Sequence, residues 1–254
     1  MRYFIHLSYR GTAYRGWQTQ AVGASVQSTL EAVLTQRLQQ PVFVVGSGRT
    51  DAGVHAQQQY AHFNLDIPID FSESLIYSIN CILPEDIAIH GIFPVRANDH
   101  VRFSAISRYY QYHISRQKNA FCNGLTYHFR PELDMERMNE ACRILLKYTD
   151  FKSFSKAKAD VTHFHCRLEF AYWVRSEPDR LTFHIKANRF LWGMVRTIVG
   201  TMLEIGQERM SLAQFEQIIL ARDRTVAGRA APANGLYLVE VAYPPNVTAH
   251  WPEY

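Results

Sequence analysis

Short segments with two different hydrophobic periods alternate along this chain, and this alternation limits its fold more than any other feature. Residues 3–9 carry apolar side chains at every second position, which is typical of a strand. Residues 26–38 space them three or four apart, as a helix does, and Ser25 is a suitable N-cap. A hairpin is predicted at 166–187. Because both halves mix strands and helices in this way, the sequence predicts an α+β fold with mainly antiparallel sheets flanked by helices.

Further elements follow from the same two periods. Ser211 and Gln214 form a capping-box pattern that predicts the start of a helix. The remaining expected strands are 41–45, 56–63, 110–114 and 236–243, and the remaining expected helices are 71–82, 134–148 and 190–203. In the last of these helices, Arg189, Gly193, Arg196 and Gly200 are predicted to share the face opposite the apolar stripe. A solvated helix face is the plainer interpretation of that set.

The distribution of charge changes near residue 105. Residues 1–105 carry 7 basic and 8 acidic side chains, whereas residues 106–254 carry 20 and 15. We therefore expect an N-terminal domain at 1–104 and a C-terminal domain at 105–254. Of the 27 basic residues, 21 are Arg, whose planar guanidinium binds phosphates and stacks on bases. A basic second half with 13% aromatic residues overall suits RNA, although ordinary solvated charges would give a similar count.

Composition excludes several other classes of protein. With 47% apolar residues, the 254-residue chain is not of the disordered class, and no stretch is long enough to predict a membrane span. The first residues lack the apolar run of a signal peptide, and the four cysteines form no C-x-x-C pair, so we expect a cytoplasmic protein with reduced thiols. The segment His163-x-His165-Cys166 has no second ligand pair at zinc spacing, so we expect no metal site.

The most unusual segment is the glycine-rich loop at 46–55, which contains Asp51. Its three glycines allow turns that side chains would block. Arg49 lies two residues before Asp51, so both side chains point the same way in extended backbone, and a guanidinium keeps a nearby carboxylate ionised. Such a carboxylate can act as a nucleophile or stabilise a cation at a sugar carbon. A structural turn with an ordinary ion pair is the alternative.

Several segments together resemble the tRNA pseudouridine synthase A family. The loop sequence Gly-Arg-Thr-Asp-Ala-Gly-Val-His-Ala at 48–56 resembles the family signature. The other matching segments occur in the family order and lie at 9–20, 25–31, 80–87, 102–112, 150–154, 194–200 and 230–236. The chain departs from the pattern at Tyr109, where many members have a basic residue, at Trp192-Gly193, and at 161–166, which matches no part of it.

This resemblance implies an isomerase that converts uridine to pseudouridine at positions 38, 39 and 40 of the tRNA anticodon stem-loop. It implies that Asp51 is the nucleophile, attacking C1′ of the sugar or assisting glycal formation, and that Tyr110 packs against the uracil. It also implies that Arg196 pairs with Asp51 and that Arg49 helps to flip the base. No cofactor is expected. A homodimer is implied, with a positively charged cleft between the two domains of a pseudouridine synthase fold.

Two other functions remain open from the sequence. A non-catalytic RNA-binding module of the same fold would keep the aromatic and Arg residues without needing the Asp51 loop. A carboxylate glycosidase acting on free nucleosides would need a second carboxylate as its acid, and none is recognisable. Tyr112, on the same face as Tyr110, is interpreted as a packing residue, and His55 as a structural residue rather than a base.

Overall fold

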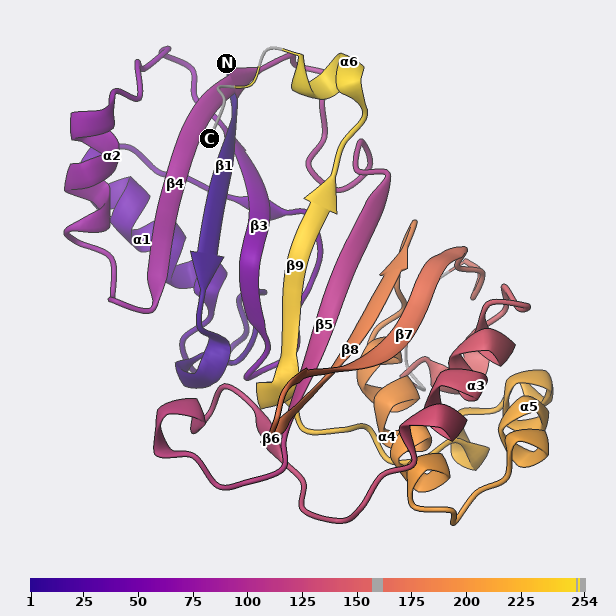
Figure 1. Cartoon of the computed structure of the whole chain (residues 1–254). Coiled ribbons are helices and arrows are strands. Elements are labelled where there is room, and N and C mark those ends of the chain that lie inside the picture. Colours follow the sequence, from indigo (N-terminus) through magenta and orange to yellow (C-terminus); the bar gives the residue numbers. More distant parts are fainter. Residues whose placement is uncertain (157–161, 250, 252–254) are drawn as a thin grey trace. The chain divides into compact units, whose positions relative to one another are not determined.

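The structure is a computed structural model that describes residues 1–156, 162–249 and 251 (Figure 1). The chain is mixed α and β with mainly antiparallel strand pairs, as expected. It divides into two compact units, which are Met1–Ile106 with Leu238–Tyr254 (unit 1) and Ser107–Tyr237 (unit 2). The domain limits 1–104 and 105–254 stay a prediction. Among the described residues, no helix has the length and apolar character needed to cross a membrane.

Unit 1 is built on strands in the order β4-β1-β3-β9, with the short β2 beside β3. Strand β1 lies in the middle and pairs antiparallel with both neighbours, with Ile5 opposite Ala61 on β3 and Ile92 on β4. The elements are β1 (Arg2–Tyr9), the 3-10 helix η1 (Gly11–Ala13), α1 (Val26–Leu38), β2 (Val45–Gly46), β3 (His55–Asn64), α2 (Glu73–Asn80), β4 (Ile87–Val95), β9 (Leu236–Ala242, in unit 1 from Leu238) and α6 (Pro245–Thr248).

The strand predicted at residues 3–9 is present as β1, and its odd-numbered residues share one face of the sheet. Tyr3, Ile5, Leu7 and Tyr9 are all buried. Helix α1 begins at the predicted cap, where the Ser25 hydroxyl accepts from the Ser28 amide at 3.0 Å. Its expected apolar residues are buried except for Leu38, which is half-buried at the end of the helix. Strand β4 was not predicted, because its buried residues do not alternate strictly with polar ones.

The predicted strand at 41–45 is mostly wrong, because only Val45 and Gly46 join the sheet. Val42 and Val44 are buried, but α1 satisfies their backbone groups instead of a neighbouring strand. The Val42 amide donates to the Thr35 hydroxyl at 3.0 Å, and the Val44 amide donates to the Glu31 carboxylate at 2.9 Å. The run of β-branched residues therefore predicts burial correctly, but it does not predict strand pairing.

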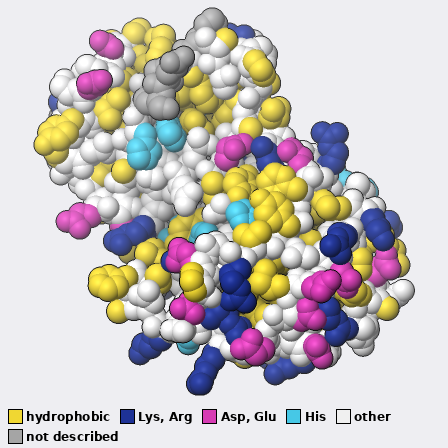
Figure 2. All heavy atoms as spheres, in the orientation of Figure 1, with side chains coloured by type: hydrophobic (Ala, Val, Ile, Leu, Met, Phe, Trp, Pro, Cys, Tyr) yellow, Lys and Arg dark blue, Asp and Glu magenta, His cyan; other side chains and the backbone are white. Residues whose placement is uncertain are grey.

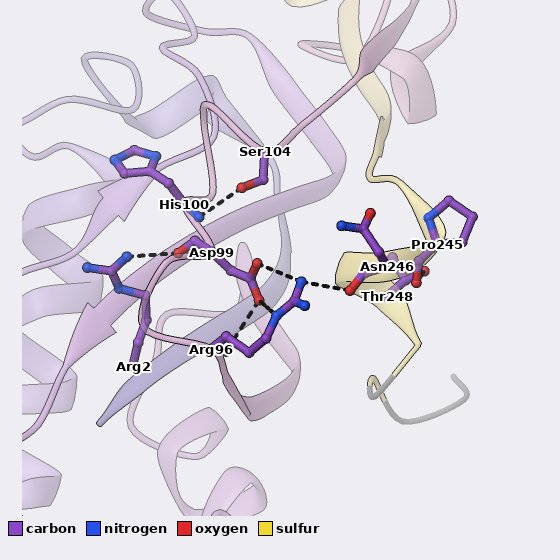
Figure 3. A network of polar contacts seen from close by, with 8 residues as sticks. All are labelled: Arg2, Arg96, Asp99, His100, Ser104, Pro245, Asn246 and Thr248. Carbon is purple, nitrogen blue, oxygen red and sulfur yellow. Dashed lines mark hydrogen bonds and ion pairs between the residues drawn. The ribbon is translucent and has the colours of Figure 1, made fainter.

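A network of polar contacts holds the C-terminal helix α6 within unit 1 (Figure 3). The Asp99 carboxylate is nearly buried and accepts from Nε and Nη2 of Arg96, both at 3.1 Å. The same Arg96 Nη2 donates to the carbonyl of Asn246 at 2.7 Å, and Arg2 donates to the carbonyl of Asp99 at 2.8 Å. Arg96 and Asp99 therefore link α6 to Arg2 at the start of β1.

Unit 2 is built on strands in the order β5-β8-β7, with β6 parallel to the end of β5. The elements are β5 (Ser107–Ser115), η2 (Ala120–Cys122), β6 (Tyr127–His128), α3 (Met135–Leu145), η3 (Lys152–Phe154), β7 (Leu168–Glu177), β8 (Arg180–Ala187), α4 (Met194–Gly206), α5 (Leu212–Ala221), η4 (Arg224–Val226) and η5 (Ala233–Gly235). The predicted hairpin is confirmed, and its turn is shortened to Pro178-Asp179. The predicted capping box at Ser211 is also present.

One face of the unit 2 sheet forms the core beneath the helices. Tyr112 on β5, Phe183 on β8 and Trp173 on β7 lie side by side in register, and all three are buried. Asn139 of α3 holds β7 at this point, because its side-chain amide both donates to and accepts from the backbone of Trp173. The Trp173 indole N–H also points to the sulfur of Met202 on α4 at 3.3 Å.

The long helix expected from residue 190 begins four residues later, at Met194. Gly193 precedes it with a φ of +76°, a left-handed conformation that cannot continue a right-handed helix. Phe190 and Leu191 have helical spacing relative to the later apolar residues, but they lie before the helix. The period had predicted that Arg189, Gly193 and Arg196 share a helix face. This prediction is wrong, because Arg189 and Gly193 precede the helix.

Four histidines gather on the strands of unit 1 and the segment after β4. The rings of His6 and His90 lie 5.0 Å apart, and those of His62 and His100 lie 4.7 Å apart. The Nδ1 atom of His62 accepts from the Val101 amide at 3.3 Å. Burial, with a smaller effect of His90, lowers the pKa of His6 to about 4. Burial, followed by the charges of Arg2 and His100, lowers the pKa of His62 to about 4.

We expect the free energy of unfolding to fall as the pH is lowered from about 6.5 to about 4. In this window the unfolded chain protonates His6 and His62 while the folded chain keeps them neutral. Each histidine adds a slope of at most about 1.4 kcal/mol per pH unit. Urea unfolding across this range measures the slope, and His62→Gln should make it shallower. An equal slope in that variant would contradict the role of His62.

Candidate active site

The Asp51 loop runs from β2 to β3 and is anchored on both sides of the aspartate. Thr50 is buried, and its hydroxyl lies 2.9 Å from the Tyr9 hydroxyl. Its carbonyl accepts from the Trp17 amide at 3.2 Å. On the other side, the Asp51 carbonyl accepts from the Val54 amide at 3.1 Å, and Gly53 supplies the positive φ of this tight turn. The backbone at Asp51 is therefore held from two directions.

The loop at 11–17 packs against the Asp51 loop at distances that only glycine allows. A Cβ on Gly11 would lie 1.9 Å from the carbonyl oxygen of Val54, and one on Gly16 would lie 2.5 Å from that of Thr50. His55 is buried and its Nδ1 accepts from the Gly11 amide at 3.1 Å. This bond gives His55 a structural role in joining the two loops.

The side chains of the loop differ in exposure from their anchored neighbours. Asp51 is half-buried between the buried Thr50 and Val54, and Arg49 is exposed. Both predicted residues therefore lie on one loop of unit 1, with the carboxylate better enclosed than the guanidinium. The loop begins at Ser47 and Gly48, which β3 holds: the Ser47 amide donates to the Tyr60 carbonyl at 2.8 Å.

Tyr110 and Arg196 lie in unit 2. Tyr110 is half-buried on β5. Its ring contacts the ring of Phe190 edge to face, with the centroids 5.1 Å apart and the planes at 89°. Sequence reasoning missed Phe190, because the helical period assigned it to the buried stripe. Tyr112 on the same face is buried, and its hydroxyl donates to the Pro232 carbonyl at 2.8 Å, which confirms it as a packing residue.

Arg196 sits in the first turn of α4 and is joined to the segment before η5. Its Nε donates to the Ala231 carbonyl at 2.7 Å, and the Ala231 amide donates back to the Arg196 carbonyl at 2.8 Å. Gly200 makes this approach possible, because a Cβ there would lie 1.8 Å from the carbonyl oxygen of Arg229. Burial raises the pKa of the neighbouring Tyr112 phenol, and the charge of Arg196 opposes that effect.

Other candidates from the sequence have ordinary contacts. The His163 ring faces Arg189, with Nε2 and Nη1 3.2 Å apart, and its Nδ1 accepts from the His165 amide. Cys166 is buried, and burial raises the pKa of its thiol to about 12. Within the part of the chain that the structure describes, no three His, Cys, Asp or Glu side chains are grouped to hold a metal ion. Of the stretch 161–166, Val161 lies outside the described residues.

Comparisons with known proteins place this chain in a class of enzymes. Residues 141–244 match the family model described as tRNA pseudouridine synthase. The chain is 46% identical over 243 residues to "tRNA pseudouridine synthase A" of Parabacteroides distasonis, covering 96% of each protein. It is 46% identical over 249 residues to the protein of that name from Porphyromonas gingivalis, covering 97% of this chain and 98% of the relative.

A more distant relative agrees. The "tRNA pseudouridine synthase A" of Bacillus pumilus is 36% identical over 241 residues, covering 93% of this chain and 97% of that protein. The similarity thus extends over both units and includes the Asp51 loop. The chain belongs to the tRNA pseudouridine synthase A family, and it is an enzyme of the isomerase class.

We expect Gly11→Ala to lower the free energy of unfolding by about 1–3 kcal/mol, because its methyl group overlaps the Val54 carbonyl and the two loops must separate. Gly48→Ala is the matched control. Its Cβ meets nothing within 4 Å, so the loss of backbone freedom in the unfolded chain should stabilise the protein by about 0.4–1 kcal/mol. Urea unfolding measures both. Equal effects of the two substitutions would show that the packing of the loops is unimportant.

Proposed function

We propose that this enzyme isomerises uridine to pseudouridine at positions 38, 39 and 40 of the tRNA anticodon stem-loop, with Asp51 as its nucleophile. That it is an isomerase making pseudouridine from uridine in tRNA follows from its family. The positions and the residues are the proposal. We also propose that it works in the cytoplasm on tRNA as a homodimer.

The presentation of Asp51 carries this proposal. A carboxylate acts on a sugar carbon only when its position is maintained against water and thermal motion. Thr50 and Val54 anchor the backbone on both sides, while the Asp51 side chain itself is only half-buried. A residue that merely stabilised the turn would not need the packing of two glycines against its loop.

The chemistry requires little beyond a carboxylate and groups that hold the base. The bond from N1 of uracil to C1′ breaks, the base turns, and a bond from C5 to C1′ forms. The proton on C5 is lost and N1 gains one, so no electrons are exchanged with another molecule. We assign Asp51 to the sugar, where it attacks C1′ or assists glycal formation. A base inside a stack is inaccessible, so the target uridine must be flipped out.

Three further residues are assigned to the substrate. Tyr110 packs against the uracil and helps to remove the C5 proton, and its edge contact with Phe190 supports this by fixing the orientation of the ring. Arg196 acts as a catalytic and substrate-binding guanidinium, and its bond to the Ala231 carbonyl fixes its direction. Exposed Arg49 helps to flip the base.

Tritium release from tRNA containing [5-³H]uridine tests the reaction directly, since the new bond expels the C5 hydrogen. We expect release by the wild type, none by Asp51→Asn, and unchanged release by Asp66→Asn, which alters an exposed carboxylate of the same unit. Binding of tRNA by Asp51→Asn should stay within about threefold. Transcripts with a single uridine at 38, 39 or 40 test the positions. Bound tRNA without release by the wild type would favour an RNA-binding module.

The second face of the unit 2 sheet supports the homodimer. Tyr109, His184 and Tyr172 form a row across its three strands, with the rings of Tyr172 and His184 stacked at 4.7 Å. Tyr172 and Val174 are 40% and 36% exposed. Figure 2 shows hydrophobic side chains gathered around a histidine over β7 and β8. Beside this row, the charge of Lys186 is offset by Glu169, whose carboxylate lies 3.9 Å from the ammonium. A face with little net charge suits the core of a protein interface better than it suits RNA.

Sedimentation velocity tests this assignment. We expect the wild type to sediment as a species of twice the 29.4 kDa chain mass at micromolar concentration. Tyr172→Glu places a charge in the middle of the aromatic row and should shift the protein to the monomer. Val45→Glu, at an exposed apolar position of unit 1, is the control and should leave the dimer intact. A dimer that survives Tyr172→Glu would place its interface elsewhere.

A further inference from the structure

Trp192 is turned outward at the start of α4 by its two neighbours. Leu191 is buried, and its carbonyl accepts from the Met194 amide at 3.1 Å. Gly193 reverses the chain with its φ of +76°, and a Cβ there would meet nothing within 4 Å. The indole between them is 46% exposed. A single exposed aromatic residue is common on protein surfaces, so exposure alone does not indicate a function.

Lys156 holds this indole in place. The Lys156 amide donates to the Trp192 carbonyl at 2.8 Å, and its ammonium lies 3.7 Å from the centroid of the indole ring. That distance is well within the range of a cation–π interaction. The ammonium therefore covers one face of the indole and fixes the orientation of the ring, which reduces the entropy that a ligand must lose on binding.

The same stretch of chain contacts one residue already assigned to the substrate and carries another. Phe190, two residues before Trp192, makes the edge contact with Tyr110. Arg196, four residues after Trp192, lies in the first turn of α4. The indole is thus connected through one short segment to both substrate-binding residues of unit 2. This location distinguishes it from other exposed aromatics of the unit, such as Phe121 on η2.

An indole with an ammonium over one face matches the chemistry of one nucleotide, because a base can stack on the opposite face and a phosphate can pair with the cation. A uridine that leaves its stack exposes the face of the neighbouring base, and an aromatic ring can replace the lost stacking partner. We propose that Trp192 and Lys156 form a platform for a tRNA nucleotide flanking the target uridine, with Trp192 stacking on its base and Lys156 contacting its phosphate. This inference rests on the proposed function.

The experiment separates stacking from simple packing by substitutions in pairs. Trp192→Leu removes the aromatic face and keeps an apolar side chain, whereas Trp192→Phe keeps an aromatic face. We expect Trp192→Leu to raise KM in tritium release and the Kd for tRNA by about tenfold. Trp192→Phe should raise them less than threefold, with kcat within twofold of the wild type for both. Phe121→Leu is the control, and it should change neither constant.

The salt dependence of binding tests Lys156 separately. We expect Lys156→Met to reduce the slope of log Kd against log salt concentration by about 0.7–0.9, the value for one phosphate contact. Lys156→Arg should restore the slope. Lys147→Met, which removes an exposed lysine two residues after the end of α3, is the matched control and should leave the slope unchanged.

Three results would overturn the platform. The first is a KM and a Kd for Trp192→Leu equal to those of the wild type, and the second is an equal rise of these constants in Trp192→Leu and Trp192→Phe. The third is an unchanged salt slope of the Kd in Lys156→Met. Urea unfolding of each variant identifies a loss that comes from instability, and Lys156→Met retains the indole in any case. If the wild type releases tritium and the variants at Trp192 and Lys156 keep its KM, Kd and salt slope, the platform is rejected and the proposed function stands. Binding without release by the wild type would reject the proposed function, and the Kd values would then decide on the platform.

Discussion

The contact between the loop at 11–17 and the Asp51 loop is the constraint on which the arrangement of the Asp51 loop in unit 1 depends. Two backbones approach so closely that a methyl group on Gly11 or Gly16 would overlap a carbonyl oxygen. The bonds from Tyr9 to Thr50 and from Gly11 to His55 then set the relation between the loops. Because the strands β1 and β3 carry both loops, the sheet holds the backbone at Asp51 in place.

Unit 2 uses the same device with different elements. Gly200 lets the backbone near Arg229 lie against α4, and Arg196 forms a reciprocal pair of bonds with Ala231. The flexible side chain of Arg196 thereby gains a fixed direction. The contact of Lys156 with Trp192 is comparable, since a cation–π interaction orients an exposed ring.

Periodicity predicted most elements of the fold and failed where tertiary contacts replaced local ones. The strand at 3–9 and the helix after Ser25 were predictable, because alternation and a capping hydroxyl are local properties. Val42 and Val44 were interpreted as a strand, but side chains of α1 bind their backbone. The start of α4 was placed too early, because Gly193 interrupts a run whose spacing is helical.

The sequence by itself determined which residues are candidates for the site. Motifs resembling one family singled out Asp51, Arg49, Tyr110 and Arg196, because residue types and their spacing along the chain are visible without a fold. Only the tertiary structure decided how those groups are held. The partners of Thr50, Tyr110 and Arg196 lie more than thirty residues away along the chain, so their contacts depend on strand pairing and glycine-sized gaps rather than on local preference.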